Sequence, residues 1–391
     1  MMLALRGGKI LTMAGQVIEQ GTILIENGKI AAVGAGIEVP DDCQIIDVTG
    51  KVVTPGIIDA HTHLGVYPEA LDWAGEDGNE ASDPITPSMH VLDAIFPEDV
   101  GLSDAFAGGI TTVMVAPGSA NPIGGQCVVM KTLKQSTVDS MLIRKHAGLK
   151  IAFGENPRRV YGEQKKMPYT RMATAALIRE TLMKAREYMA HKDEKDHKFD
   201  YGMEAIAKVL RRQMPLRAHA HRADDIVTAI RIAEEFSVDI IIEHATEGHL
   251  IPEVLAEHNT PVIIGPNLTT RSKMELKEWS LTTPAVLARH GVKFALMSDH
   301  PVLPSAFLPV YAGLAVRFGL AEEQALRAIT LDAAEILGVA DRVGSLETGK
   351  DADIVVWSAP PLTLAGKPEL VVSSGRVAEI GSDQKVAAWR S

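Results

Sequence analysis

The sequence predicts an α/β protein, a (β/α)8 TIM-like barrel with a small β-sandwich formed by both chain ends. The barrel is predicted because eight short apolar runs alternate with helical patterns along the middle of the chain. The sandwich is predicted because both ends carry short alternating runs broken by glycine. Each end alone offers too few strands for independent stability, so we expect the two ends to pair with each other.

These patterns divide the chain into a discontinuous sandwich domain, residues 1–53 plus 344–391, and a barrel domain, residues 54–343. In the sandwich, Asn27-Gly28 between two alternating runs predicts a hairpin. The expected barrel strands are 57–61, 110–115, 127–130, 149–153, 216–219, 238–243, 261–264 and 292–297. Helical patterns cover 169–190, 223–236, 284–290 and 321–337. The acidic, proline-containing insertion 67–97 is expected to be a lid over the site.

Composition and charge exclude several classes of protein. The 391 residues are 46% hydrophobic and 23% charged, as in a globular protein with a sizeable core. A net charge of −11 argues against nucleic acid or an anionic membrane as partner. Two cysteines make no disulfide framework, the N-terminus lacks the pattern of a signal peptide, and no apolar run approaches the ~20 residues of a membrane helix. We expect a cytoplasmic homo-oligomer that acts on a small-molecule substrate.

The tripeptide His61-Thr62-His63, at the end of the first expected strand, carries the clearest chemical signal. Side chains alternate along a strand, so the two imidazoles should face the same way. Neutral imidazole is the commonest nitrogen ligand of zinc and similar ions. A single pair of this kind is weak evidence, because histidines also occur on solvated strand ends.

Three later strand ends repeat the pattern. Leu216-Arg-Ala-His-Ala-His221 contains His219, the run from residue 238 ends in His244, and the run from residue 292 leads to Asp299. In a barrel of parallel strands these ends converge on one face. Four strand ends that each carry a ligand predict a divalent metal site, whereas any one of them alone would be interpreted as a core or loop residue.

The constellation and its flanks resemble the metal-dependent amidohydrolase superfamily, and most of all its imidazolonepropionase and prolidase branch. The resemblance is carried by Pro55-Gly-Ile-Ile-Asp-Ala-His-Thr-His63, the segment around His219, Ile242-Glu-His-Ala245, and Gly344-Ser-Leu-Glu-Thr-Gly-Lys-Asp-Ala-Asp-Ile-Val-Val356. It implies that His61, His63 and Asp299 bind a first metal ion. His219 and His244 would hold a second ion or contact a substrate oxygen. The cofactor is therefore expected to be one or two divalent ions, zinc first, with manganese, iron or cobalt as alternatives.

A metal-dependent hydrolase of carbon–nitrogen bonds, in amides or cyclic amides of small molecules, is the predicted function. A bound divalent ion makes water a nucleophile near neutral pH and polarises a carbonyl. Asp299 can take a proton from that water and pass it to the departing nitrogen, so Asp299 and His244 are the expected catalytic residues. The alternatives are an Xaa-Pro dipeptidase-like metallopeptidase and a deaminase. Many deaminases of this superfamily carry His-x-x-Glu after the fifth strand, where this chain has Arg222.

Two residues of the fourth expected strand compete as a bridging ligand between two ions. Lys150 resembles the position of the carboxylated bridging lysine of dihydroorotases, dihydropyrimidinases and some prolidases. Glu155 resembles the bridging glutamate of N-acetylglucosamine-6-phosphate deacetylases. Their odd separation should place them on opposite faces of a regular strand. Because side chains alternate along a strand, Lys150 is expected to point into the barrel, which slightly favours the lysine as the bridging ligand.

Further residues are expected near the site. His221 shares a face with His219 and is a candidate substrate group that can exchange roles with it. Asn121 is a candidate substrate contact, and one cation of the set Arg158, Arg159, Arg271 and Lys273 is expected to hold a substrate carboxylate.

Arg217 should face the barrel interior and therefore needs a buried partner. We predict that this partner is Asp59, two residues before His61 on the same strand.

Overall fold

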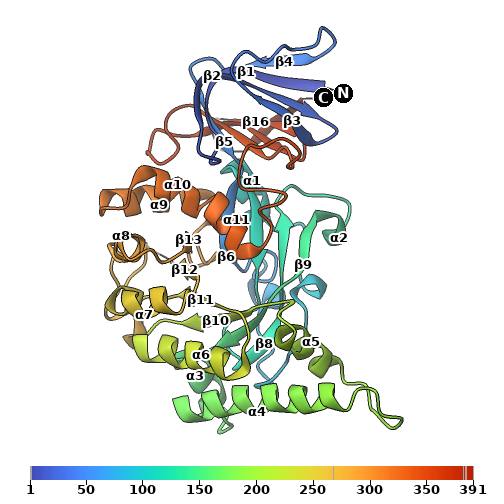
Figure 1. The fold of residues 1–391 in the computed structure, drawn as a ribbon, viewed down its shortest axis with the longest axis vertical. Coiled ribbons are helices and arrows are strands. Elements are labelled where there is room, and N and C mark those ends of the chain that lie inside the picture. Colours follow the sequence, from blue (N-terminus) through green and yellow to red (C-terminus); the bar gives the residue numbers. More distant parts are fainter. Residues whose placement is uncertain (1, 267, 382, 384, 391) are drawn as a thin grey trace.

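The computed structural model describes residues 2–266, 268–381, 383 and 385–390. An eight-stranded sheet lies in the middle of the molecule, and a nine-stranded sheet made by both chain ends caps it (Figure 1). Helices surround the central sheet on the side away from the chain ends and along one flank (Figure 1). The fold is thus mixed α/β, as predicted.

The central sheet curves into a nearly closed barrel in the order β13-β12-β11-β10-β9-β8-β7-β6. Past the ends of β13 and β6, His63 N donates to His300 O (2.8 Å) and Asp299 N donates to His61 O (3.3 Å), which joins the two edges. Each strand overlaps the residues predicted for it. The strands are β6 Ile57–Thr62, β7 Ile110–Val115, β8 Ile123–Lys131, β9 Leu142–Ala152, β10 Leu216–Ala220, β11 Ile240–His244, β12 Val262–Ile264 and β13 Phe294–Leu296.

The expectation that all barrel strands run parallel is wrong for β8, which pairs antiparallel with both β7 and β9. The connection from β7 to β8 covers only residues 116–122 and contains no helix. A parallel neighbour requires a crossover of a dozen residues or more, so this short connection returns the chain antiparallel. The connection to β9 is also short, and it reverses the chain again.

Helices cover the outer face of the barrel, and α11 closes the end of the barrel that faces the terminal sheet (Figure 1). The predicted helix at 223–236 coincides with α6, whereas 321–337 forms two helices, because the backbone of Thr330 (φ −140°, ψ −99°) leaves the helical region. Ala334 and Leu337 pack with Ile58 and Met114 in one buried cluster, so the last helix plugs the barrel. The helices are α1 Val100–Ala107, α2 Val138–Met141, α3 Glu155–Glu163, α4 Arg171–Ala190, α5 Tyr201–Leu210, α6 Ala223–Phe236, α7 Pro252–Glu257, α8 Thr283–Arg289, α9 Leu308–Arg317, α10 Glu322–Ala328 and α11 Leu331–Leu337.

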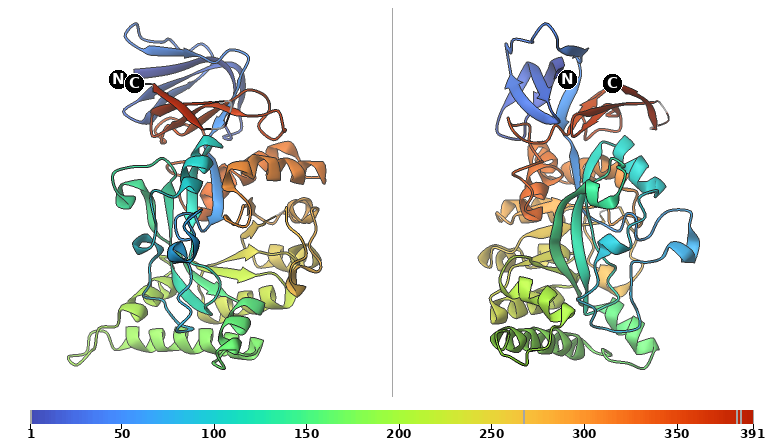
Figure 2. Two further views of the ribbon diagram at one scale, coloured as in Figure 1. Left: turned by 180° about the vertical axis from the view of Figure 1, so that it is seen from behind. Right: turned by 90° about the vertical axis from the view of Figure 1, so that its right-hand side faces the viewer.

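Both chain ends build one hydrogen-bonded sheet in the order β17-β16-β15-β14-β5-β1-β2-β3, with β4 paired to β1. The antiparallel pairing of β5 with β14 joins the two ends, which lie together in Figure 2. Asn27 (φ 51°) and Gly28 (φ 78°) form the predicted hairpin turn between β2 and β3. The strands are β1 Met2–Leu11, β2 Val17–Glu26, β3 Lys29–Gly34, β4 Gln44–Asp47, β5 Val52–Pro55, β14 Ile354–Trp357, β15 Pro368–Ser373, β16 Arg376–Ile380 and β17 Val386–Arg390.

Buried charges connect the terminal sheet to the barrel. Lys131 at the end of β8 pairs with Asp353 and, at 3.1 Å, with Asp351. Asp351 also contacts Lys29 (2.6 Å) and Arg342 (2.8 Å). Both carboxylates are 4% exposed, so each needs these cations to offset the free-energy cost of burying its negative charge.

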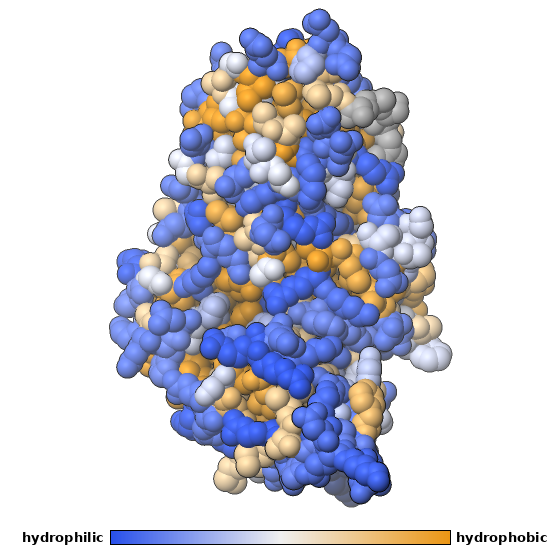
Figure 3. All heavy atoms as spheres, turned by 45° about the vertical axis from the view of Figure 1, so that its right-hand side comes forward, coloured by the Kyte–Doolittle hydropathy of each residue, from blue (hydrophilic) through white to orange (hydrophobic). Residues whose placement is uncertain are grey.

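Hydrophilic side chains cover most of the face shown in Figure 3, with hydrophobic residues visible between them. Across the described residues, no helix has the length and apolar composition required to cross a membrane.

Candidate metal centre

His61, His63 and Asp299 meet where β6 and the segment after β13 come together. His61 Nε2 and His63 Nε2 each lie 3.4 Å from the same atom, Asp299 Oδ1. His61 is fully buried, and its Nε2 has no hydrogen-bond partner among the described residues. Two imidazole nitrogens that approach one carboxylate oxygen without saturating it suit a divalent cation, so these donors fit a metal ion.

A local irregularity in β6 sets the direction of His61. The pairing of β6 with β7 shifts register between Asp59 and Thr62, so strict alternation of side chains fails there. Asp299 has a left-handed backbone (φ 57°), which is uncommon for a residue other than glycine and often marks a functional site. His63 Nδ1 donates to Ala116 O (2.8 Å), which leaves its Nε2 available as a ligand.

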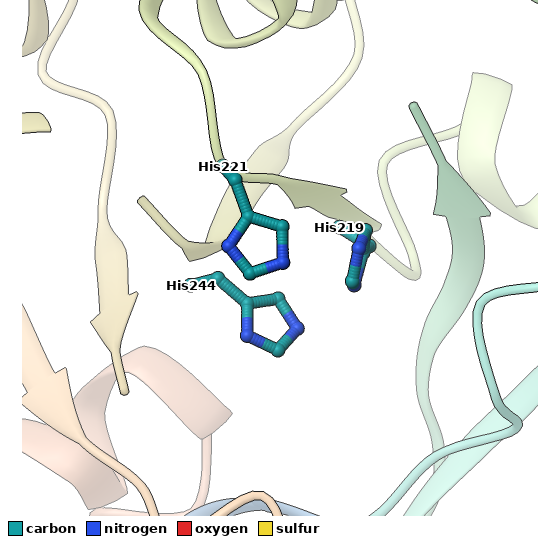
Figure 4. Close-up of side chains that lie close together, drawn as sticks. All are labelled: His219, His221 and His244. Atoms are coloured by element: carbon teal, nitrogen blue, oxygen red, sulfur yellow. The ribbon is translucent and has the colours of Figure 1, made fainter. Parts of the chain in front are cut away.

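A second group of ligands lies beside the first and consists of His219, His221 and His244. Figure 4 shows the first two at the end of β10 and the third at the end of β11, with the rings gathered together. One nitrogen from each ring lies within 4.8 Å of the others, and His61, His244 and Asp299 form another group on the same criterion. His244 therefore links the two groups.

The backbone of β11 turns His244 toward this cluster. On a regular strand it would share a face with Ile242, which packs in the helix-facing core. Left-handed φ values at His244 (74°) and Ala245 (45°) end the strand and break that alternation. His244 Nδ1 donates to Gly265 O (3.0 Å), which points its other nitrogen at the cluster.

Burial keeps the imidazoles in the form that binds metals. It lowers the pKa of His63, of His219 and of His221, and it lowers the pKa of His244 to about 3. Burial alone would raise the pKa of Asp299, but the imidazoles of His244, His61 and His63 around it hold this pKa well below its usual value. Neutral imidazoles beside an ionised carboxylate are the protonation states that metal coordination demands.

A cavity of about 270 Å³ opens over both ligand groups. The insertion 67–97 contributes Tyr67 and Asn79 to its wall, so the predicted lid segment does reach the site. Lys273 brings an ammonium group to the same wall, where it pairs with Glu275 (2.8 Å). Asn156 also lines the cavity, and its amide lies 3.5 Å from His219 Nε2.

The predicted pair between Asp59 and Arg217 is wrong. Arg217 Nε donates to Glu243 Oε1 (2.7 Å), and its guanidinium also donates to Ala60 O (3.1 Å). Asp59 instead accepts hydrogen bonds from the hydroxyls of Ser298 (2.5 Å) and Ser305 (2.6 Å). The register shift in β6 is the reason, because it turns Asp59 and His61 to different sides.

The two candidates for a bridging ligand lie in different places. Lys150 is fully buried in the barrel, with Nζ 2.6 Å from Glu243 Oε2. The other oxygen of Glu243 lies 3.0 Å from His61 Nδ1, so Lys150 lies near the first ligand group. Glu155 begins α3 and lines a separate cavity with Arg158 and Arg159.

Three expected substrate contacts lie outside the lining of the histidine cavity. The amide of Asn121 donates to Glu80 O (2.7 Å), Asp83 O (2.8 Å) and the Tyr161 hydroxyl (2.9 Å), which ties the lid segment to α3. Arg158 Nε donates to Tyr169 O (3.3 Å). Arg271 donates to Lys277 O (2.9 Å) and Trp279 O (3.1 Å).

Sequence patterns alone did not single out Glu243, and they indicated Lys273 only as one of four cations that could hold a substrate carboxylate. Glu243 directly follows three isoleucines, and a carboxylate at the end of such an apolar run could have indicated a buried charge with a partner.

Comparisons with known proteins find relatives over most of the chain. The family model "Amidohydrolase family" matches residues 52–378. Amidohydrolase tasK of Hapsidospora irregularis is 31% identical over 91% of this chain, which spans only 39% of that relative. The imidazolonepropionase of Erwinia tasmaniensis is 26% identical over 90% of both chains. The crystal structure of an amidohydrolase from Thermotoga maritima has a TM-score of 0.93 and 45% identity, and covers 99% of this chain and 100% of its own.

Proposed function

Because the chain belongs to the amidohydrolase family, we propose that it is a metal-dependent hydrolase that cleaves a C–N bond, in an amide or cyclic amide, of a small molecule. The observation that carries the proposal is the convergence of His61 and His63 on one oxygen of Asp299. The cavity above it supports a small substrate, since about 270 Å³ lies near the lower end of the roughly 300–1,000 Å³ typical of small-molecule sites.

A divalent ion, zinc by first choice, would be held by His61, His63 and Asp299, with His219 and His244 beside it. When bound, such an ion acidifies water and polarises a carbonyl. Asp299 is ionised and faces the cavity, so it can accept a proton from water and return it to the departing nitrogen. His244, which is neutral at pH 7, can donate or accept a hydrogen bond at a substrate oxygen.

The proposal is tested by assaying purified protein against cyclic amides, N-acyl amino acids and Xaa-Pro dipeptides, before and after chelation. We expect hydrolysis of at least one class, loss of the activity on chelation, and recovery on addition of zinc or manganese. Activity that survives complete metal removal would contradict the proposal. Release of ammonia without cleavage of an amide would assign the chain to the deaminases instead.

For the bridging ligand we propose Lys150 in preference to Glu155. After its ammonium group loses a proton, the neutral amine of Lys150 could add to carbon dioxide and lose a second proton, which would give an anionic carbamate ligand near Glu243 and His61. We expect two metal equivalents per chain in the wild-type protein, about one in Lys150→Ala, and two in Glu155→Ala, measured by elemental analysis of dialysed protein. Two retained equivalents in the lysine variant would contradict this assignment.

We also propose that residues 1–53 plus 344–391 form a separate domain, folded as a β-sandwich, beside a barrel domain of residues 54–343. The support is a buried cluster that contains side chains from both ends, such as Leu5 and Ile23 with Ile354 and Val372, and is distinct from the barrel clusters.

A further inference from the structure

The buried carboxylate of Glu243 lies beneath the proposed metal ligands and contacts three other side chains. Its Oε2 accepts from Lys150 Nζ (2.6 Å), and its Oε1 accepts from Arg217 Nε (2.7 Å). The same Oε1 lies 3.0 Å from His61 Nδ1. Glu243, Arg217, Lys150 and His61 are all fully buried, so water does not compete for these contacts.

The contact with His61 matches a pattern shared by three other histidines of the centre. His63 Nδ1 donates to Ala116 O (2.8 Å) and His244 Nδ1 donates to Gly265 O (3.0 Å). His221 Nδ1 lies 2.7 Å from the Thr246 hydroxyl. A partner at Nδ1 fixes the tautomer and the ring orientation, so that the other nitrogen is free to bind a metal. For His61, the atom in the corresponding place is Glu243 Oε1.

We propose that Glu243 is a positioning residue that holds the proton of His61 on Nδ1 and directs Nε2 of the same ring toward Asp299. This inference rests on the proposed metal-dependent function. At 3.0 Å the two atoms are at hydrogen-bond separation, although the N–H direction is bent away from the oxygen. A small rotation of the ring aligns them, and such contacts commonly tighten when a site is filled.

Arg217 explains why a carboxylate is tolerated at this depth. An unpaired buried carboxylate is very costly, and the guanidinium compensates it through a direct hydrogen bond. Carboxylation of Lys150 would remove the second cation, and Glu243 would then depend on Arg217 and His61. The contact with His61 is independent of the state of Lys150, because it uses the other carboxylate oxygen.

Metal affinity of two variants, Glu243→Gln and Glu243→Asp, tests the proposal. The aspartate variant keeps the negative charge but is one methylene shorter, so its carboxylate withdraws from His61. The long side chains of Lys150 and Arg217 can follow the carboxylate and keep its charge compensated, so the variant should stay folded. We expect zinc affinity, measured by competition with a chromophoric chelator, to fall about 10- to 100-fold in both variants. The visible absorption of the cobalt-substituted protein should shift, because the orientation of a ligand changes.

The matched control is Asp353→Asn, which removes another buried carboxylate paired with a lysine, at the junction of the two sheets. It should lower stability without changing zinc affinity or the cobalt spectrum. Wild-type affinity and an unchanged spectrum in folded Glu243→Asp would overturn the proposal. Neither readout requires a substrate. If no amide is hydrolysed but zinc affinity falls as expected, the positioning role stands and the proposed function fails.

Discussion

Replacement of Asp299 by asparagine is expected to lower kcat of the metal-loaded protein by about 10²- to 10⁴-fold, the usual contribution of a positioned proton-transfer group. The amide has nearly the same shape but cannot accept a proton from water. The neutral amide is also a weaker metal ligand than the carboxylate, whose Oδ1 lies 3.4 Å from His61 Nε2 and from His63 Nε2 in the wild-type protein. Initial rates at saturating substrate, divided by the measured metal content, give this effect separately from metal loss.

The control for this variant is Asp225→Asn, which alters a buried carboxylate on α6 that pairs with Arg171 (3.0 Å) and lies outside the lining of the histidine cavity. It should keep kcat within about twofold of the wild type while losing some stability. If Asp299→Asn retained more than a tenth of the wild-type kcat at full metal content, a proton-transfer role for this residue would be excluded.

Replacement of Arg217 by methionine is expected to lower the free energy of unfolding by about 3 kcal/mol, the lower end of the range for a broken buried pair, because the carboxylate of Glu243 loses its guanidinium partner but keeps Lys150. Arg217 and Glu243 are both fully buried, and methionine fills much of the volume of the lost side chain. Urea titration of the metal-free protein, followed by circular dichroism, measures the change. Metal-free protein is used so that weaker metal binding does not add to the effect.

Arg212→Met is the matched control, since Arg212 pairs with Asp239 (2.5 Å) at the surface with 65% of its side chain exposed. Exposed pairs of this kind contribute at most about 1 kcal/mol. Equal losses of unfolding free energy in the two variants would show that the buried ion pair stabilises the fold no more than an exposed one.

The positions of the barrel strands, and the nearness of the histidines and Asp299 at their ends, could be predicted because both follow from local sequence patterns. An apolar run such as 238–243 reports burial on both faces, and it overlaps β11. His61 and His63 share a strand end, and the rule that strand ends meet at one face brings them near His244 and Asp299. The hairpin at Asn27-Gly28 is equally local, because the two residues adopt the positive φ values that such a turn needs.

The partner of Arg217 could not be predicted in the same way. Two-residue alternation pointed to Asp59, but alternation holds only while the strand is regular, and the pairing of β6 with β7 shifts register after Asp59. The true partner, Glu243, lies on β11, next to the strand β10 that carries Arg217. In the register of these two strands, Glu243 lies opposite His219. That register depends on the whole barrel and not on either segment.

The sequence by itself determined which segments become strands, which residues bring imidazoles and a carboxylate to the strand ends, and that the two chain ends pair with each other. Only the tertiary structure decided the antiparallel direction of β8, the left-handed turn that swings His244 toward its neighbours, and the placement of Lys150, but not Glu155, beside the ligand groups. The physical reason is that burial and side-chain chemistry are properties of a residue and its near neighbours. Strand direction, register and the pairing of buried charges arise from contacts between segments far apart in the chain.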